Sequence, residues 1–223
     1  MEETKSNWAC VANMIKDKEN KAIQLGRYAS YWFHKTPRRM LHSMSYYKFA
    51  SKLIGQSRRV LDVGCNEGLG TWLLAKECGY AEGIDFDVEA IDAARKNFSK
   101  ENISFHCKDF IEFDGKQNWD AITSFDVIEH IYPNHVDSFF FKIKSSLSTM
   151  GMTIIGTPSE ISQKFASEIS KKGHVNIYSP SRLEEEMKKH FSYVFMFSAN
   201  DEIVHTGYPQ LAHYLITVGF KKR

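Results

Sequence analysis

The segment that decides the fold is VLDVGCNEGLG, residues 60–70. It begins as an apolar run typical of a β-strand, passes through a turn that contains Gly64, Asn66 and Gly68, and continues as a helix. Small residues in such a turn let the backbone approach a ligand closely, and the start of the following helix offers backbone N–H groups that lack partners. The segment therefore predicts a strand–turn–helix unit at a ligand site, although a tight turn without a ligand has the same composition.

Strand-like and helix-like stretches alternate from residue 58 onward. The expected strands are 58–63, 80–85, 103–107, 119–125 and 152–157, and the expected helices are 68–79, 88–98, 135–147 and 179–191. Two further strands, 192–198 and 210–220, follow one another without a helix between them. Such alternation is typical of an α/β fold with a parallel sheet covered on both faces, and the closing pair indicates one antiparallel strand at the end.

The first 56 residues have a different character, because they are rich in aromatic and basic side chains. Their single proline is Pro37. We expect two or three helices that break near Thr36 and Pro37, since the residue before a proline avoids the helical conformation. We interpret residues 1–56 as a helical cap over a substrate site and residues 57–223 as the α/β domain.

The composition restricts the classes of protein to consider. A chain of 223 residues with 43% apolar residues can bury a sizeable core. Its formal net charge of +2, without a run of five basic residues, argues against a nucleic-acid partner. No apolar run approaches the roughly 18 residues of a membrane span, and the four cysteines form no CxxC pair. We expect a cytoplasmic protein that does not bind membranes, and a homodimer is compatible with the sequence.

Acidic residues mark the ends of three successive predicted strands. Asp62 lies in the first, Asp85 ends the second, and Asp109 follows the third. The carboxyl ends of parallel strands form the edge at which open α/β sheets bind ligands. At that edge Asp85 could accept hydrogen bonds from ribose hydroxyls, and Asp109 could accept one from an adenine amino group. Phe86 and Phe110 follow these acids and could pack against the adenine face.

A nicotinamide-dependent dehydrogenase also uses a glycine-rich turn and a ribose-binding acid. The spacing in this sequence is G-x-N-x-G, whereas a pyrophosphate-binding turn requires G-x-G-x-x-G. A pyrophosphate would also lie poorly beside Asp62, while an acid there suits a ligand with a positive amine. S-adenosylmethionine has ribose, adenine and an amine but no phosphate, so the pattern favours S-adenosylmethionine.

The motifs resemble those of class I S-adenosylmethionine-dependent methyltransferases. LDVGCNEG resembles the first motif of this family, GIDFD the second, KDF the third and WDAITSFDVIEHI the fourth-strand motif. GMTIIGTP is similar to the fifth strand of the small-molecule branch, which includes ubiquinone-biosynthesis O-methyltransferases and bacterial sugar and surface-glycan methyltransferases. The resemblance covers roughly residues 58–160. It implies a Rossmann-like, seven-stranded, mostly parallel sheet whose last strand is antiparallel.

The resemblance implies S-adenosylmethionine as the cofactor. It places the first-motif residues around the methionine part, Asp85 on the ribose, and Asp109 with Phe110 at the adenine. Asn66 replaces the middle glycine of the family motif, and we expect the turn to be kept because asparagine tolerates a left-handed conformation. The predicted cofactor-binding residues are Asp62, Gly64, Cys65, Asn66, Gly68, Asp85, Phe86, Asp109 and Phe110.

Residues 125–136, FDVIEHIYPNHV, follow the fourth predicted strand and contain the candidate catalytic residues. On a helix Asp126, Glu129 and His130 would share one face, and D-x-x-E is also the spacing of a capping box. In the ubiquinone branch, and in RNA-end 2′-O-methyltransferases with an E-x-x-E-H pattern, the matching residues are metal ligands. The resemblance therefore implies Mg²⁺ or Mn²⁺, held by these three residues. His174 is a candidate fourth ligand, because we expect its loop after the fifth strand to return to the same edge of the sheet. Asp126 is one methylene shorter than the family's glutamate, and the alternatives are His130 as a metal-free general base or a purely structural cap.

Two other segments contain candidate substrate residues. YASYWFHKTPRRM, residues 28–40, combines Trp32 with Arg38 and Arg39. This combination suits an acceptor with a flat or apolar part and an anionic group, although the aromatics could be core contacts and the arginines solvated. The loop between the last two strands offers Asn200 and His205.

These patterns predict a methyltransferase that acts on a small polar acceptor. We expect O-methylation of a nucleotide-linked sugar or a surface-glycan precursor. The alternatives are an RNA 2′-O-methyltransferase, which the near-neutral charge disfavours, and N-methylation of a small molecule. A cofactor-binding protein without catalysis is a further alternative, which the intact strand-end acids disfavour.

Overall fold

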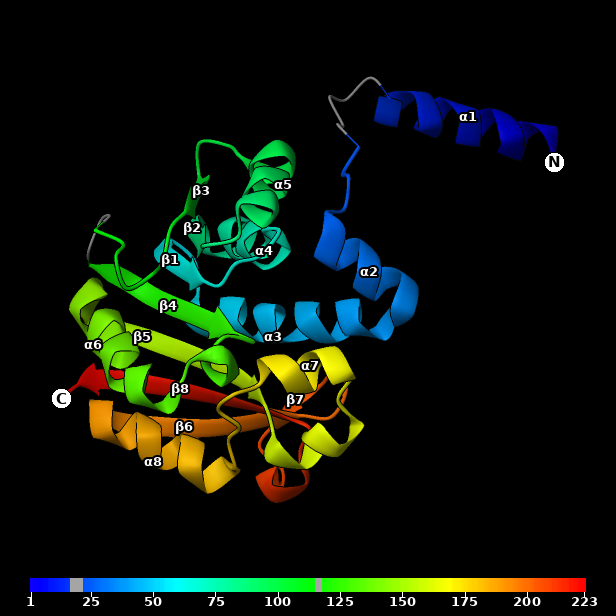
Figure 1. Ribbon diagram of the computed structural model, residues 1–223. Coiled ribbons are helices and arrows are strands. Elements are labelled where there is room, and N and C mark those ends of the chain that lie inside the picture. The colour runs from blue at the N-terminus through cyan, green and yellow to red at the C-terminus, as the bar shows by residue number, and fades with distance from the viewer. Residues whose placement is uncertain (17–21, 115–117) are drawn as a thin grey trace.

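The computed structural model describes residues 1–16, 22–114 and 118–223. An eight-stranded sheet with the strand order β3-β2-β1-β4-β5-β8-β6-β7 forms its centre (Figure 1). The strands are β1 (Arg58–Val63), β2 (Gly79–Asp85), β3 (Ile103–Cys107), β4 (Trp119–Phe125), β5 (Leu147–Pro158), β6 (Phe191–Ala199), β7 (Val204–His205) and β8 (Tyr214–Lys222). The α-helices are α1 (Glu2–Lys16), α2 (Arg27–Lys35), α3 (Arg38–Ile54), α4 (Leu69–Cys78), α5 (Val88–Phe98), α6 (Val136–Ser146), α7 (Glu168–Gly173) and α8 (Pro180–His190).

The sheet is parallel from β3 to β5 and ends in an antiparallel part. Strand β8 pairs antiparallel with both β5 and β6, which confirms the predicted antiparallel last strand. The expected number of seven strands is wrong, because β7 adds an eighth. This strand consists of Val204 and His205 and pairs with Ser198 and Ala199. Two residues are too few to give an alternating pattern, so no sequence signal marks this strand.

Helices cover both faces of the sheet. Helices α3, α4 and α5 contribute to one hydrophobic cluster, and α6 and α8 contribute to a second cluster. Adjacent residues of β1 point to opposite faces, so Val60 belongs to the first cluster and Leu61 to the second. Burial on both faces explains why the central strands are nearly continuous apolar runs.

The described residues of the N-terminal segment form three helices with different surroundings. Residues 1–14 are exposed, and α1 stands apart from the sheet (Figure 1). Helix α3 belongs to the core, where Tyr46 and Ala50 are buried. The predicted break is confirmed, because α2 ends at Lys35 and α3 begins at Arg38. The role of residues 1–56 as a substrate cap stays a prediction.

No helix within the described ranges has both the length and the apolar character that crossing a membrane requires.

The turn between β1 and α4 has a left-handed backbone at three positions. The φ angles are 74° at Gly64, 49° at Asn66 and 80° at Gly68. A Cβ atom at Gly64 would lie 2.2 Å from the Cγ2 atom of Val127, and one at Gly68 would lie 2.7 Å from the ring of Phe105. Asn66 takes the conformation expected of a glycine substitute, so the predicted turn is kept.

Asp62 is a fully buried carboxylate in the middle of the sheet. Its oxygens accept hydrogen bonds from the hydroxyls of Thr71 at 2.6 Å, Thr123 at 2.8 Å and Tyr47 at 3.2 Å. Burial disfavours the charged form and raises the pKa of Asp62 to about 6, even though the three hydroxyls favour the ionised carboxylate. These bonds join β1 to α3, α4 and β4.

The raised pKa of Asp62 predicts a pH-dependent stability. Between about pH 4 and pH 6 the unfolded chain loses the Asp62 proton while the folded chain keeps it, so the free energy of unfolding falls as the pH rises. Asp62→Asn removes the titrating carboxyl group and with it this loss of stability. Between pH 4 and pH 7, the free energy of unfolding of the variant, measured with urea, should therefore rise relative to that of the wild-type protein by on the order of 2 kcal/mol.

Asp114→Asn is the control, because Asp114 is exposed at the surface. Its difference from the wild-type protein should be nearly the same at both pH values. If the difference in free energy of unfolding between Asp62→Asn and the wild-type protein were also the same at pH 4 and pH 7, Asp62 would have an ordinary pKa.

Candidate active site

Two adjoining cavities lie at the carboxyl edge of the parallel strands. The first, of about 820 Å³, is lined by the ends of β1, β2 and β3 and by residues before and within α6, and is named the cofactor cavity after the predicted cofactor residues that line it. The second, of about 440 Å³, lies between α2, α3, the β1–α4 turn and the loop after β4, and is named the acceptor cavity after the predicted substrate residues that line it. Both cavities are lined by Tyr28, Gly64, Asn66, Asp126 and His130. This set of residues is the junction through which the two cavities meet.

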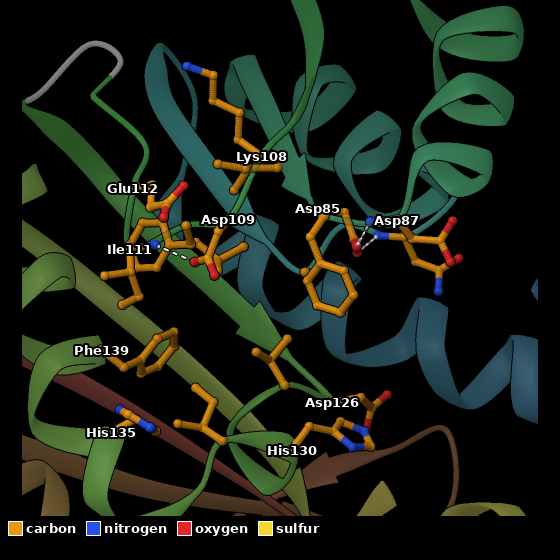
Figure 2. Close-up of a pocket in the computed structure, with 18 of the residues that line it drawn as sticks. Asp85, Asp87, Lys108, Asp109, Ile111, Glu112, Asp126, His130, His135 and Phe139 are labelled. Atoms are coloured by element: carbon orange, nitrogen blue, oxygen red, sulfur yellow. Dashed lines mark hydrogen bonds between the residues drawn. The ribbon is translucent and has the colours of Figure 1, made fainter.

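Asp85 and Asp109 both line the cofactor cavity, as predicted, and Figure 2 shows them at the end away from Asp126 and His130. Oδ2 of Asp85 accepts a hydrogen bond from the Asn66 N–H at 2.9 Å, and Oδ1 accepts one from the Asp87 N–H at 2.9 Å. Oδ1 of Asp109 accepts from the Ile111 N–H at 2.8 Å. These bonds fix both carboxylates at the cavity wall.

The two predicted aromatic residues also line the cofactor cavity but differ in burial. Phe86 is 79% exposed, so one face of its ring is free for a ligand. Phe110 is buried and packs edge-on against Phe139, with ring centroids 5.7 Å apart. Both rings therefore offer apolar surface to a ligand in this cavity.

The remaining predicted cofactor residues lie at the turn or beneath it. Gly64 and Asn66 line both cavities, and Cys65 lines the acceptor cavity. Asp62 and Gly68 line neither cavity. Burial raises the pKa of the Cys65 thiol well above its usual value, so this thiol is uncharged at neutral pH.

Asp126 does not share a helix face with Glu129 and His130, so this expectation is wrong. Asp126 has a φ of 57°, and the helical turn that follows is a short 3-10 turn, Ile128–His130. No side-chain cap hydrogen bond starts this turn, so the capping-box alternative is wrong as well. Oδ2 of Asp126 instead accepts from the hydroxyl of Tyr46 at 2.7 Å and from the guanidinium of Arg39 at 3.3 Å.

Glu129 is 1% exposed, and only one of its two carboxylate oxygens has a hydrogen bond. Oε2 accepts a hydrogen bond from the Thr157 hydroxyl at 3.0 Å, whereas Oε1 has no hydrogen-bond partner within the described part of the chain and lies 4.0 Å from Nε2 of His130. Oδ1 of Asp126 is likewise buried and unpartnered there. Burial, together with the charge of Asp126, raises the pKa of Glu129 well above its usual value. Two neighbouring carboxylates therefore each present one bare oxygen.

His130 and His174 are fixed so that each presents a bare Nε2 atom. Nδ1 of His130 lies 2.8 Å from the carbonyl oxygen of Gly173, and Nδ1 of His174 lies 2.8 Å from Oε1 of Gln163. Because an oxygen acceptor requires a proton on Nδ1, Nε2 keeps its lone pair in both neutral rings. Glu129, His130 and His174 each supply one ligand atom within 4.8 Å of the others. Asp126 is not part of this cluster.

The main-chain oxygen of Glu129 explains how His174 reaches this cluster from a later loop. It accepts hydrogen bonds from the N–H groups of Val175 and Asn176, at 2.9 and 3.0 Å. These bonds place the loop after α7 beside the turn that contains His130. The expectation that this loop returns to the carboxyl edge is confirmed.

Sequence reasoning missed the residues that support the site. Tyr46 holds Asp126, Thr157 holds Glu129, and Gln163 orients His174. They come from α3, from β5 and from a 3-10 turn, Glu160–Phe165, and no local motif links them to their partners. Glu67 was also missed, and its contacts with α2 are described below.

Two of the predicted substrate residues line the acceptor cavity, namely Trp32 and Arg39. The guanidinium of Arg39 lies 5.3 Å from the Trp32 ring centroid and forms the ion pair with Asp126. Arg38 is exposed and lines neither cavity.

Asn200 and His205 also lie outside both cavities. Oδ1 of Asn200 accepts from the His213 N–H at 3.0 Å, and Nδ1 of His205 accepts from the Gly207 N–H at 3.1 Å. Both side chains thus stabilise the loop around β7, and their role in substrate binding stays a prediction.

Comparison with known proteins relates part of the chain to methyltransferases. Residues 60–151 match the family model described as a methyltransferase domain. The ubiquinone biosynthesis O-methyltransferase of Coxiella burnetii (strain Dugway 5J108-111) is 34% identical over 79 residues, which is 34% of each chain. The enzyme of the same name from Rhodopseudomonas palustris (strain BisB5) is 27% identical over 113 residues, covering 50% of this chain and 44% of that protein. The chain thus spans less than half the length of these curated relatives.

Solved structures agree on the fold. The N-methyltransferase NodS from Bradyrhizobium japonicum WM9, in complex with S-adenosylhomocysteine, superimposes with a TM-score of 0.61 at 16% identity. The match covers 82% of this chain and 86% of that one. The methyltransferase resemblance seen in the motifs is confirmed: residues 60–151 match a methyltransferase domain, and the fold is shared with a solved S-adenosylhomocysteine-bound methyltransferase.

Proposed function

We propose that the chain transfers the methyl group of S-adenosylmethionine to a hydroxyl oxygen of a small anionic acceptor. Our candidate acceptor is a nucleotide-linked sugar or a related surface-glycan precursor. The observation that carries the proposal is the junction of the two cavities. A cofactor bound along Asp85 and Asp109 would direct its methyl group through the junction, towards the carboxylates and imidazoles of the acceptor cavity.

The cofactor cavity supplies a partner for each part of S-adenosylmethionine. The carboxylate of Asp85 suits the ribose hydroxyls, and the space between Phe86 and Phe110 suits the adenine ring. The methionine part would lie over the turn at Gly64. Asp62 is buried beneath this turn, and its charge would favour the ammonium group of the methionine part.

The acceptor cavity supplies positioning and a proton acceptor. The sulfonium is already activated, so the protein has to hold the acceptor oxygen in line with the methyl group and to receive its proton. Nε2 of His130 has a lone pair, lies at the junction and can take that proton. Trp32 offers an aromatic face to the acceptor, and Arg39, which pairs with Asp126, offers guanidinium N–H donors.

The carboxylate and imidazole groups also fit a divalent metal ion. The bare Oε1 atom of Glu129 is buried, and the charged form of a buried carboxyl group is unfavourable without a cation, whereas Asp126 already pairs with Arg39. Glu129, His130 and His174 converge, and the Nδ1 atoms of both rings are held by oxygens, as is usual behind metal-bound histidines. These three residues would hold Mn²⁺ or Mg²⁺, and Asp126 lies outside the cluster. A bound ion would lower the pKa of an acceptor hydroxyl.

N-methylation of a small amine is the second candidate function. The same bare oxygens of Asp126 and Glu129 would attract the ammonium form of an amine acceptor. An RNA acceptor has less support. The charge of Arg39 in the cavity is already paired with Asp126, and the net charge of +2 offers little attraction for a polyanion.

Binding of the cofactor product tests the first half of the proposal. Asp85→Ala should weaken S-adenosylhomocysteine binding roughly tenfold or more in isothermal titration calorimetry, because a charged hydrogen-bond acceptor for the ribose is lost. Asp114→Ala, at the exposed Asp114, should bind like the wild-type protein. Equal affinities for the two variants would contradict the assignment of Asp85.

Manganese binding tests the metal assignment without depending on turnover. Titration of the protein with Mn²⁺, followed by electron paramagnetic resonance of the free ion, should show one tight site. His130→Ala and His174→Ala should each weaken it at least about tenfold. His135→Ala is the control, because His135 lines the cofactor cavity away from the cluster. Wild-type affinity in His174→Ala, or full methyl transfer by protein dialysed against a chelator, would reject the metal.

The reaction itself is tested with S-adenosylmethionine labelled on its methyl group. The protein is incubated with nucleotide-linked sugars, with small primary amines and with RNA that has a free 3′ end, and labelled product is measured. We expect the label on an oxygen of a nucleotide-linked sugar. His130→Ala should abolish labelling whether His130 acts as a general base or as a metal ligand. Label on the amine or on the RNA would support the corresponding alternative instead.

A further inference from the structure

We infer that Glu67 is a positioning residue that holds helix α2 against the cofactor turn and thereby couples cofactor binding to the shape of the acceptor cavity. The inference rests on the proposed function for the identity of the cofactor. The hydrogen bonds of Glu67 themselves do not depend on it.

Glu67 binds the first turn of α2 through both carboxylate oxygens. Oε1 accepts from the Tyr28 N–H at 2.7 Å, and Oε2 accepts from the Ala29 N–H at 3.0 Å. The first N–H groups of a helix lack partners within the helix, and the residue before α2, Gly26, provides no side-chain cap. A negative charge is favourable at this end of a helix. Glu67 therefore caps α2 from 38 and 39 residues further along the chain.

The absence of a side chain at Gly26 is what allows this approach. A Cβ atom at Gly26 would lie 2.3 Å from Oε1 of Glu67. Gly26 has an ordinary extended backbone, with φ −75° and ψ −173°, so its conformation alone does not require glycine. The position is restricted by the space that the glutamate occupies. Glu67 itself is 5% exposed, so this carboxylate is buried against the helix.

Two sets of hydrogen bonds connect this cap to the predicted ribose-binding carboxylate. The Glu67 N–H donates to Oδ1 of Asn66 at 2.7 Å, and the Asn66 N–H donates to Oδ2 of Asp85 at 2.9 Å. The Tyr28 hydroxyl donates to Asp87 at 2.8 Å, two residues after Asp85. A ligand that fixes Asp85 and the turn therefore also fixes the two points that hold α2.

Helix α2 depends on this cap because it contributes little to the core. Ala29 is the one residue of α2 that is buried, and most of the other side chains of this helix are exposed. Yet Tyr28, Ala29 and Trp32 form one wall of the acceptor cavity. Displacement of α2 would therefore open the acceptor cavity while leaving the sheet intact.

Limited proteolysis with trypsin tests the inference, because α2 and the start of α3 contain cleavage sites at Arg27, Lys35, Arg38 and Arg39. Cleavage in this segment is measured by mass spectrometry with and without S-adenosylhomocysteine. In the wild-type protein the ligand should slow cleavage. In Glu67→Ala cleavage should be roughly tenfold faster, the size expected for loss of a charged acceptor of hydrogen bonds, and the ligand should no longer slow it.

Three further variants separate the cap from a general loss of structure. Gly26→Ala should also speed tryptic cleavage, because its methyl group displaces the Glu67 carboxylate from the start of α2. The double variant Gly26→Ala/Glu67→Ala should be cleaved no faster than either single variant, because both substitutions remove the same interaction. Glu67→Gln keeps one acceptor oxygen, so its cleavage rate should lie between those of the wild-type protein and Glu67→Ala. Glu89→Ala is the control: Glu89 pairs with Arg27 of α2 at 3.1 Å, but both side chains are exposed and the pair should contribute little.

The outcomes distinguish the inference from the proposed function. Wild-type cleavage rates in Glu67→Ala would overturn the cap. Faster cleavage with undiminished protection by the ligand would overturn the coupling. Failure of the wild-type protein to bind S-adenosylhomocysteine in calorimetry would overturn the proposed function and the coupling, whereas faster cleavage of Glu67→Ala would still confirm the cap.

Discussion

The left-handed turn between β1 and α4 is the constraint on which the rest of the site depends. The backbone N–H groups of Gly64 and Cys65 donate to the carbonyl oxygen of Ile84, which ties the turn to the second strand. A side chain at Gly64 would collide with Val127 of the loop after β4. The turn thus fixes the floor of the cofactor cavity and the distance to the loop after β4. It also presents Asn66 to Asp85 and Glu67 to α2, so three strand ends and one helix take their positions from it.

Buried carboxylates give the site its chemical character, and the protein treats them in two ways. Asp62 is surrounded by three hydroxyl donors and serves to join the elements of the fold. Asp126 and Glu129 are each left with one bare oxygen in a buried place. The fully hydrogen-bonded carboxylate is explained by its role in the fold. A carboxylate with a bare buried oxygen lowers stability unless a cation or a proton is supplied, and such destabilising groups are typical of functional sites.

The sequence predicted those parts of the site that follow from strand order. Asp85, Asp109 and Phe110 meet in one cavity because the carboxyl ends of neighbouring parallel strands converge, whatever the side chains between them. The convergence of Glu129, His130 and His174 followed in the same way from a loop that returns to this edge. The cofactor half of the site was therefore accessible from motifs alone.

The parts that could not be predicted depend on contacts between distant segments. Asp126 has a left-handed backbone and an ion pair with Arg39, 87 residues away in the sequence, and neither has a local signal. The distinction between Arg39 in the cavity and Arg38 outside it depends on the rotation of α3. The cap on α2 depends on an ordinary-looking glutamate and an ordinary-looking glycine, which become informative only when they are seen together.

The most direct test of the account is a crystal structure of the chain with S-adenosylhomocysteine. The account predicts the ribose on Asp85, the adenine between Phe86 and Phe110, and the sulfur at the junction lined by Gly64, Asp126 and His130, facing the acceptor cavity. A sulfur atom that faces away from His130, or a ligand bound outside the cofactor cavity, would contradict it.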